Sequence, residues 1–321
     1  MNITFYLFLT LILLGAELLY LRLARHFSII DVPNERSSHT SLTTIRGGGI
    51  LFWVAALGVF IYTDYGYSSF FLGLTLAAAI SFLDDLHSVP NRYRIGIQFI
   101  AVSLLLRETG VFPNENWMLL VALVVGVGIL NAYNFMDGIN GITAFYSLVT
   151  VGTIWYWQSQ TAVEPDDSLF AFMTIALLIF TYFNARRQAV CFAGDVGSVS
   201  IAFVILYALL QLINQQQTYL PVLLLAVYGV DSVLTIGHRL CLGENIFRAH
   251  RLHLFQLLVH RLQWPHLWVS ALYAGVQLGI NGLVLLLVDS PLTTQLVAAV
   301  LVLSALVITY VLAKRQIMSR C

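Results

Sequence analysis

The chain has 321 residues, of which 59% are hydrophobic and only 10% are charged, and its formal net charge is zero. Soluble domains carry about 25% charged residues, so this composition excludes an ordinary soluble globular protein. It predicts instead one integral membrane domain over residues 1–321, with membrane lipid as its surroundings and no nucleic-acid partner.

Eleven apolar segments follow one another along the chain, and each is expected to be a transmembrane helix. Several are shorter than the roughly 20 residues that cross a hydrocarbon core, so some must extend into polar flanks. Without apolar–polar alternation, barrel strands are excluded, and the predicted fold is an all-α bundle of about 11 transmembrane helices. The segments lie near residues 3–21, 48–63, 69–83, 94–106, 117–131, 142–158, 169–183, 199–213, 219–236, 267–288 and 295–312.

Basic residues occupy alternate gaps between these segments. Of the 16 Lys and Arg residues, 15 fall in one set of gaps, and only Arg107 lies in the other. Because short cytoplasmic loops retain basic residues, this asymmetry predicts an outside N-terminus and a cytoplasmic C-terminus. A basic face of this kind attracts anionic lipid headgroups and phosphate substrates.

The first basic loop ends in Arg46, which is followed by Gly47, Gly48 and Gly49 at the start of the second segment. The guanidinium and the backbone of these glycines could together meet an anionic group. A flexible interfacial linker with cytoplasmic arginines is the alternative.

Asp84 and Asp85 end the third segment, and Arg92 and Arg94 follow them. Adjacent carboxylates repel each other unless a cation or a basic neighbour offsets them, which suits magnesium binding or proton handling. Aspartate is also unfavourable at a helix C-terminus, where the macrodipole is negative. The alternative is a solvated helix end, but function is favoured.

Polar side chains recur at three-residue steps where the fifth segment ends, at Asn131, Asn134 and Asp137. If the helix continues to Asp137, these side chains form one stripe facing one cavity. The alternative is a simple turn with an asparagine cap.

Asp195 lies in a Gly-Asp-Val-Gly-Ser motif just before the eighth segment. A helix start of this composition offers backbone amides to a phosphate and a carboxylate to its metal. Ordinary N-capping is the alternative.

The longest basic loop contains Arg248, His250, Arg251 and His253. On a helix, the two histidines share a face and the two arginines share an adjoining one, which suits a diphosphate. A basic amphipathic helix on anionic lipid is the alternative. Zinc is disfavoured because no further histidine or thiolate set accompanies these residues at ligand spacing.

Taken in order, the loops from Asp31 to Gln256 resemble those of the polyprenyl-phosphate N-acetylhexosamine-1-phosphate transferases, glycosyltransferase family 4, and most of all its O-antigen initiating branch. The resemblance implies transfer of an N-acetylhexosamine-1-phosphate from a UDP-sugar to undecaprenyl phosphate, with release of UMP. It further implies Mg2+ as cofactor, with Mn2+ as an alternative, and an active site on the cytoplasmic face of the bacterial inner membrane.

The resemblance also implies a role for each matching residue. Asp84 deprotonates or positions the lipid phosphate and shares the metal with Asp195. The remaining catalytic residues are Asp85, Asp137 and His253, and the substrate-binding residues are Arg46, Arg94, Asn131, Asn134, His250 and Arg251.

The chain departs from the family at several positions. Asn140 and His250 stand where relatives often have aspartate, and Arg94 stands where they often have lysine. Phe255 and Gln256 stand where the peptidoglycan enzyme has further histidines, which argues against that substrate. The sequence does not state the sugar, the polysaccharide pathway or the oligomeric state, with a homodimer as one alternative. Direct attack is favoured over a two-step mechanism, because the acceptor is already an anion.

Two other classes of function compete with a transferase. A membrane carrier of a phosphorylated or lipid-linked substrate would use ionisable residues inside its spans, and Glu17 and Asp231 are the candidates. The second competing class is an inactive scaffold. The carrier is disfavoured because no internal repeat accompanies Glu17 and Asp231. The scaffold is disfavoured because four loop aspartates are retained.

Overall fold

The structure is a computed structural model that describes residues 2–31, 44–110, 116–161, 167–245 and 250–319. Over these ranges it is helical, with two isolated β-bridges, from Ile30 to Ile45 and from Ile45 to Cys191, in place of any named strand. The elements are α1 (Ile3–His26), α2 (Ile50–Tyr62), α3 (Ser68–Leu86), α4 (Asn91–Thr109), α5 (Asn116–Met136), α6 (Ile142–Thr161), α7 (Ser168–Asn184), α8 (Gly194–Gln216), the 3-10 helix η1 (Leu220–Leu225), α9 (Ala226–Cys241), α10 (Leu254–His260), α11 (His266–Leu287) and α12 (Leu292–Ser319).

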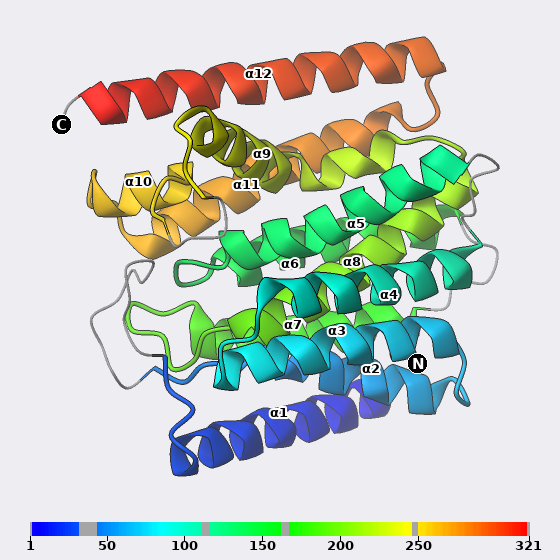
Figure 1. Cartoon of the computed structure of the whole chain (residues 1–321). Coiled ribbons are helices and arrows are strands. Elements are labelled where there is room, and N and C mark those ends of the chain that lie inside the picture. The colour runs from blue at the N-terminus through cyan, green and yellow to red at the C-terminus, as the bar shows by residue number, and fades with distance from the viewer. Residues whose placement is uncertain (1, 32–43, 111–115, 162–166, 246–249, 320–321) are drawn as a thin grey trace.

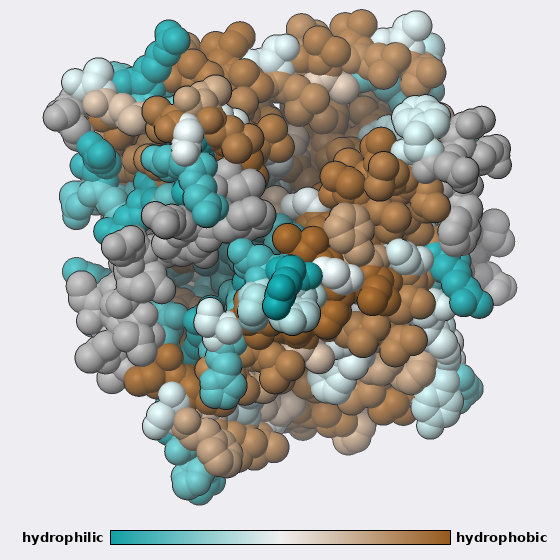
Figure 2. Space-filling view, in the orientation of Figure 1, coloured by the Kyte–Doolittle hydropathy of each residue, from teal (hydrophilic) through white to brown (hydrophobic). Residues whose placement is uncertain are grey.

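Each of the eleven predicted apolar segments corresponds to a helix, with η1 and α9 together covering the ninth. Within the described ranges, seven stretches are long and apolar enough to cross a membrane: Ile3–His26, Ser68–Leu86, Trp117–Met136, Gly194–Gln216, Leu220–Cys241, His266–Leu287 and Leu292–Ser319. The chain is therefore a multi-pass, all-helical membrane protein, whereas the number of about eleven spans stays a prediction. Hydrophilic residues gather mainly toward the end of the molecule where α10 lies, and apolar residues cover much of the remaining surface (Figure 2).

The helices run roughly side by side, with α1 at one edge of the bundle and α12 at the other (Figure 1). Near the centre, α8 packs against α2, α3, α5 and α6, and most of its residues are buried. In contrast, α12 contacts mainly α9 and α10 and leaves most of its apolar residues exposed. The N-terminus of α8 therefore lies where several helices and loops can supply side chains.

The segment before α2 lies directly against the start of α8. A Cβ atom on Gly49 would stand 2.4 Å from the Cα atom of Gly197, and one on Gly197 would stand 2.5 Å from that of Gly49. The amides of Gly48 and Gly49 donate to the carbonyl oxygens of Phe192 (2.8 Å) and Ala193 (3.1 Å). Because both amides already donate to backbone carbonyl oxygens, the expectation that they bind an external anion is wrong. Their hydrogen bonds instead hold the backbone at Arg46 close to α8.

Candidate active site

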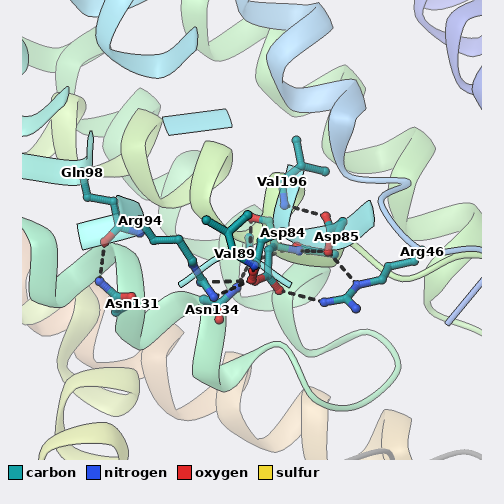
Figure 3. A network of polar contacts seen from close by, with 12 residues as sticks. Arg46, Asp84, Asp85, Val89, Arg94, Gln98, Asn131, Asn134 and Val196 are labelled. Carbon is teal, nitrogen blue, oxygen red and sulfur yellow. Dashed lines mark hydrogen bonds and ion pairs between the residues drawn. The ribbon is translucent and has the colours of Figure 1, made fainter. Parts of the chain in front are cut away.

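Five charged side chains from four parts of the chain meet at the ends of α3 and α8, and we call them the carboxylate–arginine cluster (Figure 3). Arg46 Nε lies 2.6 Å from Asp85 Oδ1, and Arg46 Nη2 lies 3.3 Å from Asp195 Oδ1. Arg94 Nη1 lies 2.5 Å from Asp84 Oδ2, and Arg94 Nη2 lies 3.2 Å from Asp195 Oδ2. Each arginine therefore joins Asp195 to one member of the aspartate pair.

The Asp85 carboxylate caps the N-terminus of α8. Its Oδ1 accepts a hydrogen bond from the amide of Asp195 (2.9 Å), its Oδ2 accepts one from the amide of Val196 (3.0 Å), and the side chain is fully buried. A helix N-terminus attracts an anion because its first amides lack partners. Here that anion is Asp85, so the expectation that these two amides meet a phosphate is wrong.

Asp84 and Arg94 form the more accessible side of the carboxylate–arginine cluster. Their side chains are 12% and 15% exposed, against 0% for Asp85. The amide of Val89, which follows the end of α3, donates to Asp84 Oδ1 (2.7 Å) and fixes this carboxylate. Asp84 therefore has both a defined position and a route to solvent, which Asp85 lacks.

Arg46 lies in a strongly negative environment. Burial opposes its charge, but the nearby carboxylates of Asp85 and Asp195 outweigh burial and raise the pKa of its guanidinium. The hydroxyl of Tyr20 in α1 donates to the backbone carbonyl of Arg46 (2.6 Å). The arginine is thus held from its backbone and from its side chain.

The carboxylate oxygens of this cluster are the kind of ligand that Mg2+ prefers. Asp84 and Asp195 contact the two terminal nitrogens of Arg94, so their carboxylates lie next to the same guanidinium. Among the residues that the structure describes, no group of three or more His, Cys, Asp or Glu side chains is placed to hold a metal. Two carboxylates suffice for Mg2+, which usually keeps several waters and takes substrate phosphate oxygens as further ligands.

The predicted stripe on α5 divides into three separate contacts. Asn131 donates through Nδ2 to Gln98 Oε1 (2.7 Å), and Asn134 donates to Ser198 Oγ (3.2 Å) in the first turn of α8. Asp137 follows the end of α5 and accepts from Thr143 Oγ1 (2.6 Å). Asn131 is thus bonded to α4, the helix that also carries Arg94, whereas Asn134 lies beside the carboxylate–arginine cluster (Figure 3). That all three side chains face one cavity stays a prediction.

Among the residues that the structure describes, no basic side chain is hydrogen-bonded to Asp137, in keeping with the absence of Lys and Arg from its loop. Burial raises the pKa of its carboxyl group to about 7, and the hydrogen bond from Thr143 opposes this shift. An aspartate of this kind changes charge near neutral pH.

Asn140 holds the Asp137 loop in place. Its Nδ2 donates to the carbonyl oxygen of Arg186 (2.8 Å), and its own carbonyl oxygen accepts from Ser270 Oγ (2.8 Å) on α11. Its amide donates to His266 Nδ1 (3.4 Å). An ionised aspartate could not donate to the Arg186 carbonyl, so the residue at this position has a structural use that the sequence did not reveal.

The histidine loop differs from its predicted form. Residues 250–253 are not helical, and α10 begins only at Leu254, so the expectation that His250 and His253 share a helix face is wrong. Their ring centroids nevertheless lie 5.0 Å apart. Arg251 is exposed, and Arg248 lies outside the described residues.

Sequence reasoning treated Asp231 only as a candidate for a carrier. The structure places it in contact with His253, whose Nδ1 lies 3.0 Å from Asp231 Oδ1. A buried carboxylate inside a span needs partners, and that signal was present in the sequence. The identity of the partner, 22 residues away, was not.

The chain is similar to known proteins over most of its length. The sequence model of the family described as "Glycosyl transferase family 4" matches residues 67–213. "Undecaprenyl-phosphate alpha-N-acetylglucosaminyl 1-phosphate transferase" of Escherichia coli K12 is 28% identical over 287 residues, covering 80% of this chain and 75% of that protein. The "Probable undecaprenyl-phosphate N-acetylglucosaminyl 1-phosphate transferase" of Bacillus subtilis is 25% identical over 261 residues, covering 75% of this chain and 71% of that protein. "Phospho-N-acetylmuramoyl-pentapeptide-transferase" of Thermotoga maritima is 26% identical over 228 residues, covering 64% of this chain and 73% of that protein.

Proposed function

Because the chain belongs to the polyprenyl-phosphate hexosamine-1-phosphate transferase family, we propose that it transfers an N-acetylhexosamine-1-phosphate from a UDP-sugar to undecaprenyl phosphate. The observation that carries this proposal is the carboxylate–arginine cluster, in which Arg46 and Arg94 meet three aspartates. Guanidinium groups bind phosphate in two-pronged fashion, and carboxylates bind the metal that accompanies a diphosphate. Both kinds of group are needed when two anionic substrates meet.

The proposed reaction is a direct displacement at phosphorus. An oxygen of the lipid phosphate attacks the β-phosphorus of the UDP-sugar and forms the new diphosphate bond. The bond from that phosphorus to the bridging oxygen breaks, and UMP leaves with this oxygen. Such a transfer depends mainly on positioning and charge neutralisation, because the acceptor already carries a negative charge.

The arginines have a double use in this proposal. In the substrate-free protein they neutralise Asp84, Asp85 and Asp195. When the phosphates enter, Arg46 and Arg94 can exchange part of these contacts for phosphate oxygens, because guanidinium groups are good ligands for both anions. We assign Asp84, the more accessible aspartate, to positioning or deprotonating the lipid phosphate, and Asp85 to holding Arg46 and α8.

Magnesium is the proposed cofactor, with manganese as an alternative, and Asp195 and Asp84 are the proposed ligands. When bound, the ion neutralises charge on the diphosphate. Asn134 and Asp137 are assigned to the nucleotide side of the site, and His250, Arg251 and His253 to phosphate contacts. Asn131, which is bonded to Gln98, is not assigned a substrate contact.

We propose that the reaction is the first membrane step of O-antigen or other cell-surface polysaccharide synthesis, at the cytoplasmic face of a bacterial inner membrane. In this orientation the N-terminus is outside and the C-terminus is cytoplasmic. A carrier has less support, because Asp231 is hydrogen-bonded to His253 and Tyr273 and is not free for an ion or substrate inside a span.

The test is transfer by the purified full-length protein in detergent, with undecaprenyl phosphate, MgCl2 and a panel of UDP-N-acetylhexosamines, measured as UMP release. We expect UMP from one donor, dependent on the lipid and abolished by EDTA. Release that persists without lipid would indicate hydrolysis. A folded protein that releases no UMP from any donor would reject the transferase.

A further inference from the structure

Asp231 is a buried carboxylate in α9 that accepts hydrogen bonds from donors on three elements. Its Oδ1 contacts His253 Nδ1 (3.0 Å) and accepts from the amide of Leu254 (3.1 Å) at the start of α10. It also accepts from Thr235 Oγ1 (3.2 Å) on the next turn of α9. Its Oδ2 accepts from the hydroxyl of Tyr273 (2.6 Å) on α11. The carboxylate thus ties α9, α10 and α11 together and has no freedom to turn.

This contact dictates how His253 carries its proton. A carboxylate oxygen only accepts, so the ring nitrogen that faces it must carry hydrogen. The proton is therefore on Nδ1, and Nε2 is the nitrogen that remains for another partner. Nε2 is buried and has no hydrogen-bond partner among the residues that the structure describes. A buried polar atom without a partner costs roughly 1–3 kcal/mol, which is recovered if a ligand supplies the partner.

The ring of His253 stands beside the Asp137 loop. It stacks on Phe255 with ring centroids 5.7 Å apart, and its other neighbour is the His250 ring at 5.0 Å. Phe255 in turn lies against Gly138, where a Cβ atom would stand 2.9 Å from the phenyl ring. The imidazole is thus packed next to the loop that carries Asp137, which the proposed function assigns to the nucleotide side.

We propose that Asp231 is a positioning residue, which holds His253 through Nδ1 so that Nε2 contacts a phosphate oxygen of the substrates. When both ring nitrogens carry hydrogen, the Nε2–H donates a charge-assisted hydrogen bond to that oxygen. This inference rests on the proposed transferase function. It assigns Asp231 to the reaction, although Asp231 itself touches no substrate.

The first test observes the ring directly and needs no substrate. The full-length protein in detergent, labelled with 15N-histidine, is examined by NMR, and the His253 signals are identified by their loss in His253→Gln. We expect Nδ1 to be protonated, and Asp231→Asn to change this protonation pattern. A His253 ring without a proton on Nδ1 overturns the inference, and this result does not depend on activity or on the folding of any Asp231 variant.

The second test uses UMP release. Asp231→Asn should lower kcat roughly tenfold to 100-fold, the effect of losing one charge-assisted hydrogen bond, and His253→Gln should lower it to a similar extent. If Asp231 acts only through His253, the double variant loses no more than His253→Gln alone. The inference is overturned if the loss of kcat in the double variant equals the product of the two single losses. It is also overturned if Asp231→Asn keeps the wild-type kcat.

Two tyrosines supply a matched control. Tyr273 donates to Asp231 itself, whereas Tyr310 lies one step further away, with its hydroxyl 2.7 Å from Thr235 Oγ1. Tyr273→Phe should lower kcat several-fold and Tyr310→Phe should leave it unchanged. Equal losses would indicate a general packing effect and overturn the inference. If the wild-type protein transfers no sugar phosphate, the phosphate contact fails together with the transferase function, and the NMR spectrum still decides the Asp231–His253 contact.

Discussion

The carboxylates of the carboxylate–arginine cluster and the carboxylate of Asp231 are compensated in different ways. In the carboxylate–arginine cluster, the positive charges of Arg46 and Arg94 offset the negative charges of Asp84, Asp85 and Asp195. Around Asp231, the donors are the His253 ring, the hydroxyls of Thr235 and Tyr273 and a backbone amide; among the residues that the structure describes, no arginine donates to it.

The difference separates a group that can exchange partners from one that cannot. A guanidinium can leave one anion for another of similar chemistry, so the arginines suit a site where phosphates come and go. The donors around Asp231 belong to three packed helices, and moving any of them would leave a buried carboxylate without partners. We therefore expect substitutions in the carboxylate–arginine cluster to affect turnover most. A substitution that disturbs both the cluster and the surroundings of Asp231 should affect stability as well.

The largest effect is expected for Asp195→Asn, because Asp195 binds both arginines and is the proposed metal ligand. We expect UMP release to fall by roughly 1,000-fold, or about 4 kcal/mol, without loss of the folded state. The matched control is Glu108→Gln. Glu108 is a carboxylate that accepts from the amides of Ser69 (2.9 Å) and Phe70 (3.3 Å) at the opposite end of α3, about 25 Å away along the helix. Activity close to wild type in Asp195→Asn would reject its role.

Asp85→Asn should reduce stability more than any other change in the carboxylate–arginine cluster. An asparagine cannot accept from both α8 amides, and it leaves Arg46 without its closest carboxylate. We expect the free energy of unfolding to fall by about 3 kcal/mol, measured by thermal unfolding in detergent. Asp84→Asn is the comparison, because that carboxylate is more accessible; an equal loss in both variants would contradict the capping role of Asp85.

Gly138→Ala tests whether the two groups are coupled through the Asp137 loop. The new methyl group would collide with Phe255, on which the His253 ring is stacked. We expect a loss of about 2 kcal/mol in stability and a lower kcat, because the ring must move. Gly128→Ala in α5 is the control, since no atom lies within 4 Å of that Cβ position. Similar behaviour of the two variants would show that the loop and the histidine are independent.

The remaining prediction concerns the dependence of stability on pH. Burial raises the pKa of Asp137 from 3.8 to about 7, so the folded protein holds a proton that the unfolded chain has already released. The contribution of Asp137 to stability is therefore fully present below about pH 4 and is lost as the pH rises to about 7, with a slope of at most about 1.4 kcal/mol per pH unit. Thermal unfolding between pH 4 and pH 8 should show a flatter dependence for Asp137→Asn. Parallel curves would mean that Asp137 is ionised throughout.

Much of the fold follows from local sequence signals. Apolar runs located every long helix, and the Gly-Asp-Val-Gly-Ser motif marked the start of α8 at Gly194. The joint use of Asp84, Asp195, Arg46 and Arg94 was expected from the family resemblance, and the structure brings these side chains together.

Long-range partners were not predictable from the sequence. Nothing near Asp85 in the sequence indicates that it caps a helix 110 residues later, and helical periodicity placed His250 and His253 on a helix that does not form. In both cases a tertiary contact decides where the side chain lies. Asp85 is held by two backbone amides of α8, and His253 is held by the carboxylate of Asp231. Spacing along the chain carries no information about such contacts.

The contact of Gly49 with Gly197 also restricts how the protein can move. With no side chain between the two backbones, we expect the segment carrying Arg46 and the first turn of α8 to move together. Arg46 and Asp195 are then expected to stay close when substrates arrive, and the opening that admits substrates is expected on the other side of the cluster, where Arg94 extends from α4. Conformational change during a catalytic cycle is then expected between α4 and α8, and not between α2 and α8.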